Sequence, residues 1–380
     1  MNSAPEKEGE MRSPVLFMIF KRPETTARVF QAIREARPPR LYIAADGPRP
    51  DRPGEDGQCE LARKAATAVD WDCDVKTLFR KKNLGCAVAC SSAITWFFQQ
   101  EREGIILEDD VLPHPDFFSF CDHMLDYYRD DPRIFQVSAS NFQMGIKRGK
   151  GSYYFSWFNH IWGWATWARA WRHYDHSMQG LTRFIKEDLP HIFPYPPAAR
   201  YFSDAFIHAK ANNIPTWAFR WFFATLKQKG LTILPNHNLA RNIGFDADGT
   251  TCTSASLWDH VETGPMQEII HPDRVEPDAE ADRLTDAMVF TPQAQSLESL
   301  FQEGWRRLET GLAYSNYELL RMARGFHGDA FLLDCLEAAT HKATGRKREA
   351  LEMIAGLRKR EPDSPIVHKL LTGTHPGPES

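Results

Sequence analysis

The sequence contains no apolar run long enough to cross a membrane. Its first apolar run, at residues 15–20, is far shorter than the ~20 residues that a membrane-spanning helix needs. Residues 1–14 before it are largely polar, with several charged residues, which is unlike a signal peptide. We therefore expect a cytoplasmic protein without a transmembrane segment, in which residues 1–14 are disordered.

Paired cysteines and a strong net charge are absent too. The seven cysteines are an odd number, and none of their spacings matches a zinc site. Cys86 and Cys90 lie one helical turn apart, a spacing more typical of packing than of a metal site. The pattern predicts free thiols in a reducing compartment. With 46 basic and 50 acidic side chains, the net charge of -4 argues against nucleic acid as the main partner.

What the sequence does contain is an alternation of apolar strands and helices. Hydrophobic residues make up 42% and charged residues 25% of the 380 residues, which is ordinary for a globular protein of two or three domains. Strands are expected at residues 15–20, 41–45, 74–79, 104–111 and 133–139. Helices are expected between them, up to residue 36 and at 58–69, 87–103 and 117–129. This alternation predicts an α/β fold with a doubly wound, mostly parallel sheet.

Three adjacent acids, Glu108, Asp109 and Asp110, end the fourth of these strands. In an open α/β sheet, ligands bind beyond the carboxyl ends of the strands. Two like charges about 4 Å apart repel by roughly 4 kcal/mol at an effective dielectric of 20, so this cluster favours a cation. Carboxylate oxygens suit Mg²⁺ or Mn²⁺, and a solvated acidic turn is the alternative. If the strand continues, Glu108 and Asp110 point to one face and Asp109 to the other.

Two further polar segments follow neighbouring strands. Asp46 and Gly47 come directly after the second strand, and residues 80–85, Arg-Lys-Lys-Asn-Leu-Gly, follow the third. Three cations, an amide and a glycine at a turn into a helix suit an anion, because helix N-termini expose free N–H groups. The sequence therefore predicts a nucleotide-phosphate and metal site at this edge of the sheet, which the polar loop 235–245 is expected to cover.

The segment 153–171 is unusually rich in aromatic residues. Trp162 and Trp164 would share one face of a strand, with Gly163 between them, and so present a flat surface to a sugar ring. Packing in the core is the alternative for each tryptophan.

The last third of the chain reads as helical. Residues 264–282 are charged and poor in aromatic residues, which is typical of a linker. Helices are expected at 293–309, 317–324, 330–341, 347–360 and 366–371, and residues 373–380 as a frayed tail. Residues 345–363 resemble the second helix and exit of one tetratricopeptide repeat. We expect region 283–372 to be a small helical appendage, with a surface for a protein partner or a dimer.

Several short motifs, in order and over about the first 250 residues, resemble GT-A type glycosyltransferases, particularly bacterial relatives of N-acetylglucosaminyltransferase I. The motifs are residues 15–23, 45–48, 83–86, 105–113, 161–171 and 239–245. The resemblance implies a GT-A domain over residues 15–263. It also implies a bacterial protein, cytoplasmic or peripheral at the inner membrane.

The resemblance further implies an inverting transferase that moves a sugar from a nucleotide-diphosphate donor, with UDP-sugars favoured, to a glycan acceptor in surface-polysaccharide synthesis. Mn²⁺ or Mg²⁺ would neutralise the leaving diphosphate, with Asp110 as the principal metal ligand. Donor contacts are implied for the remaining site residues, namely Asp46, Gly47, Lys81, Asn83, Gly85, Glu108 and Asp109.

The chain departs from the family pattern at three places. Ala218 stands where relatives have an Asp between two tryptophans, and Ala87 stands where an Arg is common. A His after the segment 242–245 is replaced by a stretch with Asp246 and Asp248, and we expect Asp248 to substitute as a metal ligand. Asp204 is the nearest carboxylate upstream of Ala218 and is our candidate for the catalytic base.

Two other functions remain open at this stage. Because of these departures from the family pattern, the first alternative is a protein that binds a nucleotide or glycan without turnover and recruits a partner through its helical region. A nucleotidyltransferase shares the acidic site but is disfavoured, because the first strand lacks the glycine-rich phosphate loop expected there.

Overall fold

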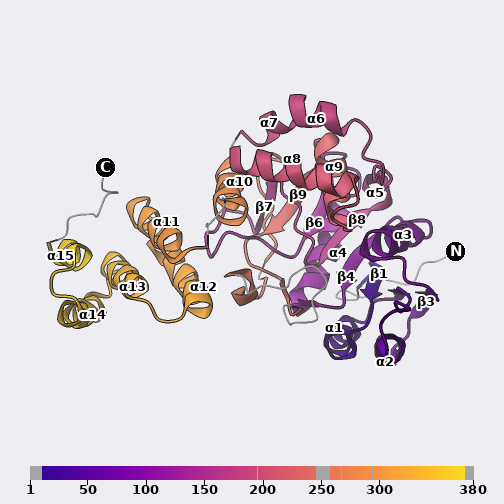
Figure 1. Cartoon of the computed structure of the whole chain (residues 1–380), viewed down its shortest axis with the longest axis horizontal. Coiled ribbons are helices and arrows are strands. Elements are labelled where there is room, and N and C mark those ends of the chain that lie inside the picture. The colour runs from indigo at the N-terminus through magenta and orange to yellow at the C-terminus, as the bar shows by residue number, and fades with distance from the viewer. Residues whose placement is uncertain (1–10, 195, 245–256, 267, 292–294, 373–380) are drawn as a thin grey trace. The chain divides into compact units, whose positions relative to one another are not determined.

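The computed structural model describes residues 11–194, 196–244, 257–266, 268–291 and 295–372 (Figure 1). The described residues divide into two compact units. The sheet unit comprises residues from 11–141, 148–244 and 262–283. The helical unit comprises residues from 142–147, 257–261 and 284–372. Each unit is described by itself below.

An eight-stranded sheet forms the centre of the sheet unit. Its strands are β1 (Val15–Ile19), β2 (Arg40–Ala45), β3 (Asp74–Phe79), β4 (Glu103–Glu108), β6 (Ile134–Ser138), β7 (Tyr153–Ser156), β8 (Trp164–Trp167) and β9 (Leu231–Pro235), in the order β3-β2-β1-β4-β8-β6-β9-β7. β1, β2, β3 and β4 are parallel neighbours. Only β8 and β7 run against the other six. The predicted α/β class and mostly parallel sheet are confirmed.

Ten helices accompany the described part of this unit. They are α1 (Pro23–Ala36), α2 (Glu55–Ala66), α3 (Cys86–Phe98), α4 (Pro115–Tyr127), α5 (Ala168–Trp171), α6 (Leu181–Glu187), α7 (Leu189–Ile192), α8 (Pro196–Lys210), α9 (Ala218–Lys227) and α10 (Ala279–Thr285). Two short strands, β5 (Val111–Pro113) and β10 (Ala240–Asn242), pair antiparallel outside the main sheet.

Successive side chains of each strand point to opposite faces of the sheet, and helices pack on both faces. Along β1, Val15 and Phe17 pack with α1, α2 and α4 in one buried cluster. Leu16 and Met18 point the other way and pack with α3, α5 and α9. Because both faces are covered, the strands read as near-continuous apolar runs, as expected for a doubly wound sheet. The carboxyl ends of β1, β2 and β4 therefore meet at one edge.

The segment 264–282, which we predicted as a linker, is instead packed against the edge of the sheet. Its backbone pairs with β7, since Ser152 N–H donates to the Ile270 carbonyl at 2.8 Å and Asp278 N–H donates to the Phe155 carbonyl at 2.8 Å. Its apolar side chains, Ile269 and Val275 among them, pack on the main core. The linker prediction was based on the average composition of the segment, which does not show that a few apolar side chains are buried. We call this segment the return segment.

Asp282 fixes the end of the return segment. Its carboxylate is 6% exposed and accepts hydrogen bonds from the Ser156 hydroxyl and, at 3.2 Å, from the Trp157 N–H. Burial raises the pKa of Asp282 to about 7, although these two donors act in the opposite direction.

The helical unit confirms the predicted helical region. Its elements are η1 (Leu257–His260), η2 (Asp286–Phe290), α11 (Leu297–Glu309), η3 (Ala313–Ser315), α12 (Asn316–His327), α13 (Phe331–Ala343), α14 (Lys347–Arg360) and α15 (Pro365–Thr372). Close packing of α11 on α13 depends on Gly304, because an added Cβ would lie 2.2 Å from the Leu336 side chain. Among the described residues, no helix has the length and apolarity to cross a membrane.

We predict that Asp282→Ala destabilises the protein by about 1–3 kcal/mol near pH 5, because two buried donors lose their acceptor. Urea unfolding followed by tryptophan fluorescence measures the effect. The control is Glu280→Ala on the same helix, where the carboxylate is exposed and pairs with Arg283. Equal effects of the two substitutions would contradict this role of Asp282.

The contribution of Asp282 should also depend on pH. Its folded-state pKa of about 7 lies above the ordinary value near 3.9 for an unfolded Asp. A raised carboxyl pKa stabilises the fold below the unfolded pKa, and this stabilisation is lost as the pH rises through the folded value. The stability gap between wild type and Asp282→Ala should therefore shrink from about pH 5 to about pH 8. A gap that widens over this range would show that the carboxylate form is the stabilising one.

Candidate functional site

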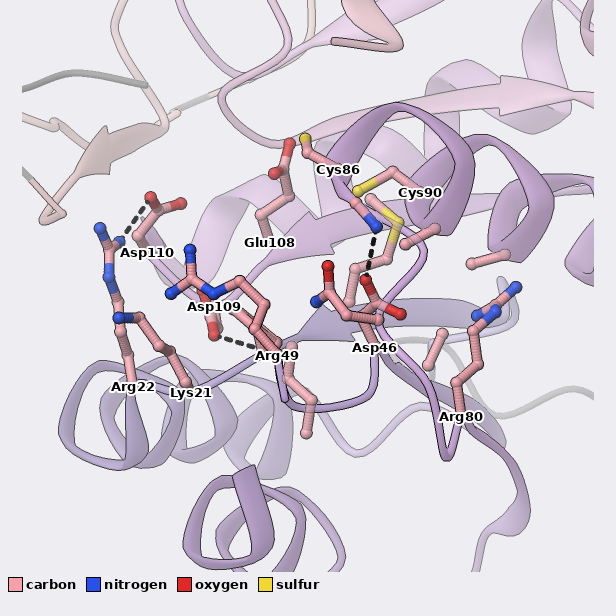
Figure 2. A pocket seen from close by; sticks show the side chains of 18 of the residues that line it. Lys21, Arg22, Asp46, Arg49, Arg80, Cys86, Cys90, Glu108, Asp109 and Asp110 are labelled. Carbon is pink, nitrogen blue, oxygen red and sulfur yellow. Dashed lines mark hydrogen bonds and ion pairs between the residues drawn. The ribbon is translucent and has the colours of Figure 1, made fainter. Parts of the chain in front are cut away.

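A pocket of about 310 Å³ opens at the carboxyl edge of β1, β2 and β4. It lies where the sequence predicted a site (Figure 2). Its charged lining is split between two signs. The four cations are Lys21, Arg22, Arg49 and Arg80, and the four carboxylates are Asp46, Glu108, Asp109 and Asp110.

Asp109 lines the pocket, but one of its carboxylate oxygens is held by the turn after β1. Its Oδ2 accepts the Phe20 N–H at 2.9 Å and the Thr26 hydroxyl at 3.5 Å. Burial, and then the neighbouring Asp110, raise the pKa of Asp109 to about 7. The Asp109 carboxyl group therefore connects the end of β4 to the turn after β1 and to the start of α1.

Asp110 forms an ion pair with Arg22, whose Nη1 lies 3.0 Å from Oδ2. The loop after β10 closes over this pair, since Ile243 N–H donates to the Asp110 carbonyl at 2.7 Å. Gly244 fits here because an added Cβ would lie 2.5 Å from Asp110 Oδ2. The end of the polar loop therefore meets the acidic triplet, as the sequence predicted.

Glu108 is the pocket carboxylate without a hydrogen-bond partner among the described residues. Figure 2 shows its side chain between the Arg22–Asp110 pair and Cys86. Burial raises the pKa of Glu108 well above its ordinary value, and the neighbouring charges of Asp110, Cys86 and Asp109 add to this effect. A cation placed here would relieve that repulsion.

The basic wall of the pocket comes mainly from the segments after β1 and β2. Arg49 donates from Nε to Glu55 Oε1 at 3.0 Å, and Lys21 Nζ lies 3.6 Å from the same carboxylate. The Arg49 hydrogen bond is the main cause that lowers the pKa of Glu55. Glu55 is 3% exposed and thus holds both cations beside the pocket. The predicted Lys81 is exposed and does not line the pocket.

Asp46 and Gly47 interlock with the turn after β3. Both Asp46 oxygens accept the Leu84 N–H at 3.0 Å, and one also accepts the Gly85 N–H at 3.1 Å. The Asn83 amide donates to the Gly47 carbonyl at 2.8 Å. These predicted donor-binding residues are therefore brought together. Their hydrogen-bonding groups build the wall of the pocket, and three of them, Asp46, Asn83 and Gly85, also line it.

The two tryptophans proposed for sugar stacking do not form a shared surface. Gly163 has a φ of +73° and β8 begins only at Trp164, so Trp162 precedes the strand. Trp164 is 1% exposed and packs against Trp217, with ring centroids 5.4 Å apart. Trp164 is therefore a core residue here, which was the alternative for each tryptophan. Trp162 is partly buried against the main core.

The predicted base and second metal ligand are not part of the described pocket. Asp204 is exposed on α8 and is not a lining residue. Asp248 lies outside the described residues. Ala218 begins α9, close in sequence to the lining residue Pro215.

Sequence reasoning missed several lining residues, namely Arg22, Arg49, Cys86 and Cys90. A signal for Arg22 was present, since Pro23 marks a helix start directly after β1 and places residue 22 at the same sheet edge. No local signal marks Arg49, because its position depends on the pairing with Glu55.

A hard divalent ion fits the donor set of Glu108 and Asp110. Mg²⁺ and Mn²⁺ are commonly bound by one or two carboxylates together with substrate phosphates. In the part of the chain that the structure describes, no group of three or more His, Cys, Asp or Glu could hold a metal ion.

No protein-family model matches the chain, and no curated protein matches it significantly. The pocket itself is therefore the basis for a functional proposal.

We predict that Gly47→Ala disrupts the site, because the new Cβ would lie 2.5–2.7 Å from the backbone of Lys81 and Lys82. Overpacking of this kind costs about 1–3 kcal/mol. The matched control is Gly57→Ala in α2, where an added Cβ meets nothing within 4 Å. Alanine should stabilise that helix by about 0.5–1 kcal/mol. Thermal unfolding of both variants tests the pair, and a neutral Gly47→Ala would contradict the interlocked turn.

Proposed function

We propose that the sheet unit is a metal-dependent glycosyltransferase of the GT-A type. It takes a nucleotide-diphosphate sugar, with UDP-sugars favoured, and passes the sugar to a glycan acceptor. The observation that carries the proposal is one pocket beyond the ends of parallel strands. In this pocket Glu108, which has no hydrogen-bond partner among the described residues, lies together with four cations.

The charge distribution suits a diphosphate bound with a metal ion. Lys21 and Arg49 face the pocket from one side and offer positive charge to phosphate oxygens. Glu108 and Asp110 would hold Mn²⁺ or Mg²⁺, which neutralises charge on the leaving diphosphate. The pocket volume of about 310 Å³ lies at the lower end of the range for ligand sites, about 300–1,000 Å³.

Arg22 shares Asp110 with the proposed ion. In the ion pair it already supplies one positive charge to the acidic end of β4. Binding of a divalent ion would therefore compete with Arg22 or add to it. In the first case Arg22 moves toward the diphosphate, where a guanidinium binds phosphate oxygens well.

One observation favours a second function, binding without transfer. Ala218 cannot accept a proton, and the carboxylates that line the described pocket are already engaged or assigned to the metal. The exposed Asp204 would have to approach the acceptor from outside the described pocket. The alternative is thus a donor- or glycan-binding protein whose helical unit recruits a partner.

Titration calorimetry with a panel of UDP-, GDP- and dTDP-sugars tests the proposal. With Mn²⁺ present we expect one donor to bind, and EDTA to abolish the binding. Asp110→Asn should weaken binding by more than about tenfold, or ~1.4 kcal/mol. Asp74→Asn, at an exposed position of β3, is the control and should bind like wild type.

Donor hydrolysis or sugar transfer by the same samples separates the two functions. Turnover that Asp204→Asn removes would support the transferase with the base we named. Tight, metal-dependent binding without any turnover would favour the binding protein. A folded protein that binds no donor at all would refute the transferase and would leave only the glycan-binding form of the alternative.

A further inference from the structure

A pair of histidines lies outside the pocket, where the return segment meets α4. His123 lies on α4 and His271 on the return segment, both in the sheet unit. Their Nε2 atoms are 3.3 Å apart, and both rings are partly buried. The two imidazoles are nearly parallel, with an interplanar angle of 24°.

This separation matches two ligands of one metal ion. With metal–nitrogen bonds of about 2.0–2.1 Å and a tetrahedral angle, two ligand nitrogens lie roughly 3.3–3.4 Å apart. The same separation allows an N–H···N hydrogen bond when one ring is protonated at Nε2. Neutral imidazole, with an ordinary pKa near 6.5, takes either role at neutral pH.

The surroundings of His271 are those of a metal-binding histidine. Its Nδ1 is 2.6 Å from the Tyr153 hydroxyl, which is in turn 2.6 Å from the Tyr128 hydroxyl. The Tyr127 ring stacks on His271 with centroids 3.8 Å apart. Ligating histidines typically donate their second ring N–H to a carboxylate, a backbone carbonyl or water, and the Tyr153 hydroxyl oxygen can accept in the same way. With the proton at Nδ1, Nε2 of His271 presents its lone pair to His123.

We propose that His123 and His271 bind a divalent transition metal of the zinc type. Two imidazoles suit Zn²⁺, Cu²⁺ or Ni²⁺, whereas the carboxylates of the pocket suit Mg²⁺ or Mn²⁺. Among the described residues, no third His, Cys, Asp or Glu completes a metal-binding group here.

The role of this site is to hold the return segment against α4. Without metal, the contacts of the segment with α4 include the imidazole pair, the Tyr127 ring on His271 and a hydrogen bond from Met266 N–H to Asp116. A bound ion replaces the contact between the two imidazoles with two coordinate bonds. The His123–His271 metal site thus stabilises the path of the chain at the edge of the sheet, independently of sugar transfer.

Titration of the EDTA-stripped full-length protein with ZnCl₂ tests the proposal. We expect one binding event, and we expect His123→Gln and His271→Gln each to weaken it by at least about tenfold. Substitution of residues that only hydrogen-bond to a metal ligand already lowers metal affinity by about 10–100-fold. His191→Gln, at an exposed histidine of α7, is the matched control and should leave it unchanged. Asp110→Asn should leave it unchanged too, which separates this site from the pocket.

X-ray absorption at the zinc edge, on wild type loaded with one equivalent, gives a readout that does not depend on the variants. Two imidazole ligands and light-atom neighbours support the proposal. No zinc binding, binding that survives both His variants, or a shell containing sulfur would overturn it and leave a hydrogen-bonded imidazole pair.

Discussion

The hydrogen bond from Phe20 N–H to Asp109 organises the end of the sheet on which the site depends. It joins the carboxyl ends of β4 and β1, which are neighbours in the parallel half of the sheet. With Asp109 turned inward, its two neighbours are left at the pocket. Asp110 then meets Arg22, and Glu108 faces the cavity with its pKa raised by burial. One backbone contact thus separates a structural acid from two acids available for chemistry.

The wall of the pocket at the end of β2 is also held by a buried carboxylate that accepts backbone N–H groups. Asp46, at the end of β2, accepts backbone N–H groups from the turn after β3 and so fixes the start of α3. An acid buried beside free N–H groups costs little, because charge-assisted hydrogen bonds replace its hydration. Buried carboxylates thus hold the backbone in place on both walls of the pocket.

The sequence predicted those features that depend on local pattern. The apolar runs that end in acids located β2, β4 and the edge where they meet, and the helix pattern located α14 at residues 347–360. Features that depend on pairing were not predictable. The partners of Asp46 follow from the β2–β3 register, which sets Ala45 beside Phe79. Aromatic density did not reveal that Trp164 faces the core. Mean composition did not reveal the few side chains that hold the return segment.

The central claim is that the acidic end of β4 binds a metal together with a nucleotide diphosphate. Crystals grown with Mn²⁺ and UDP test it most directly, through the anomalous signal of manganese. We predict one manganese peak in contact with Glu108 and Asp110, with the diphosphate between it and the Lys21 and Arg49 side chains. A nucleotide bound elsewhere, or a pocket in which Arg22 still holds Asp110 and no manganese is present, would contradict it.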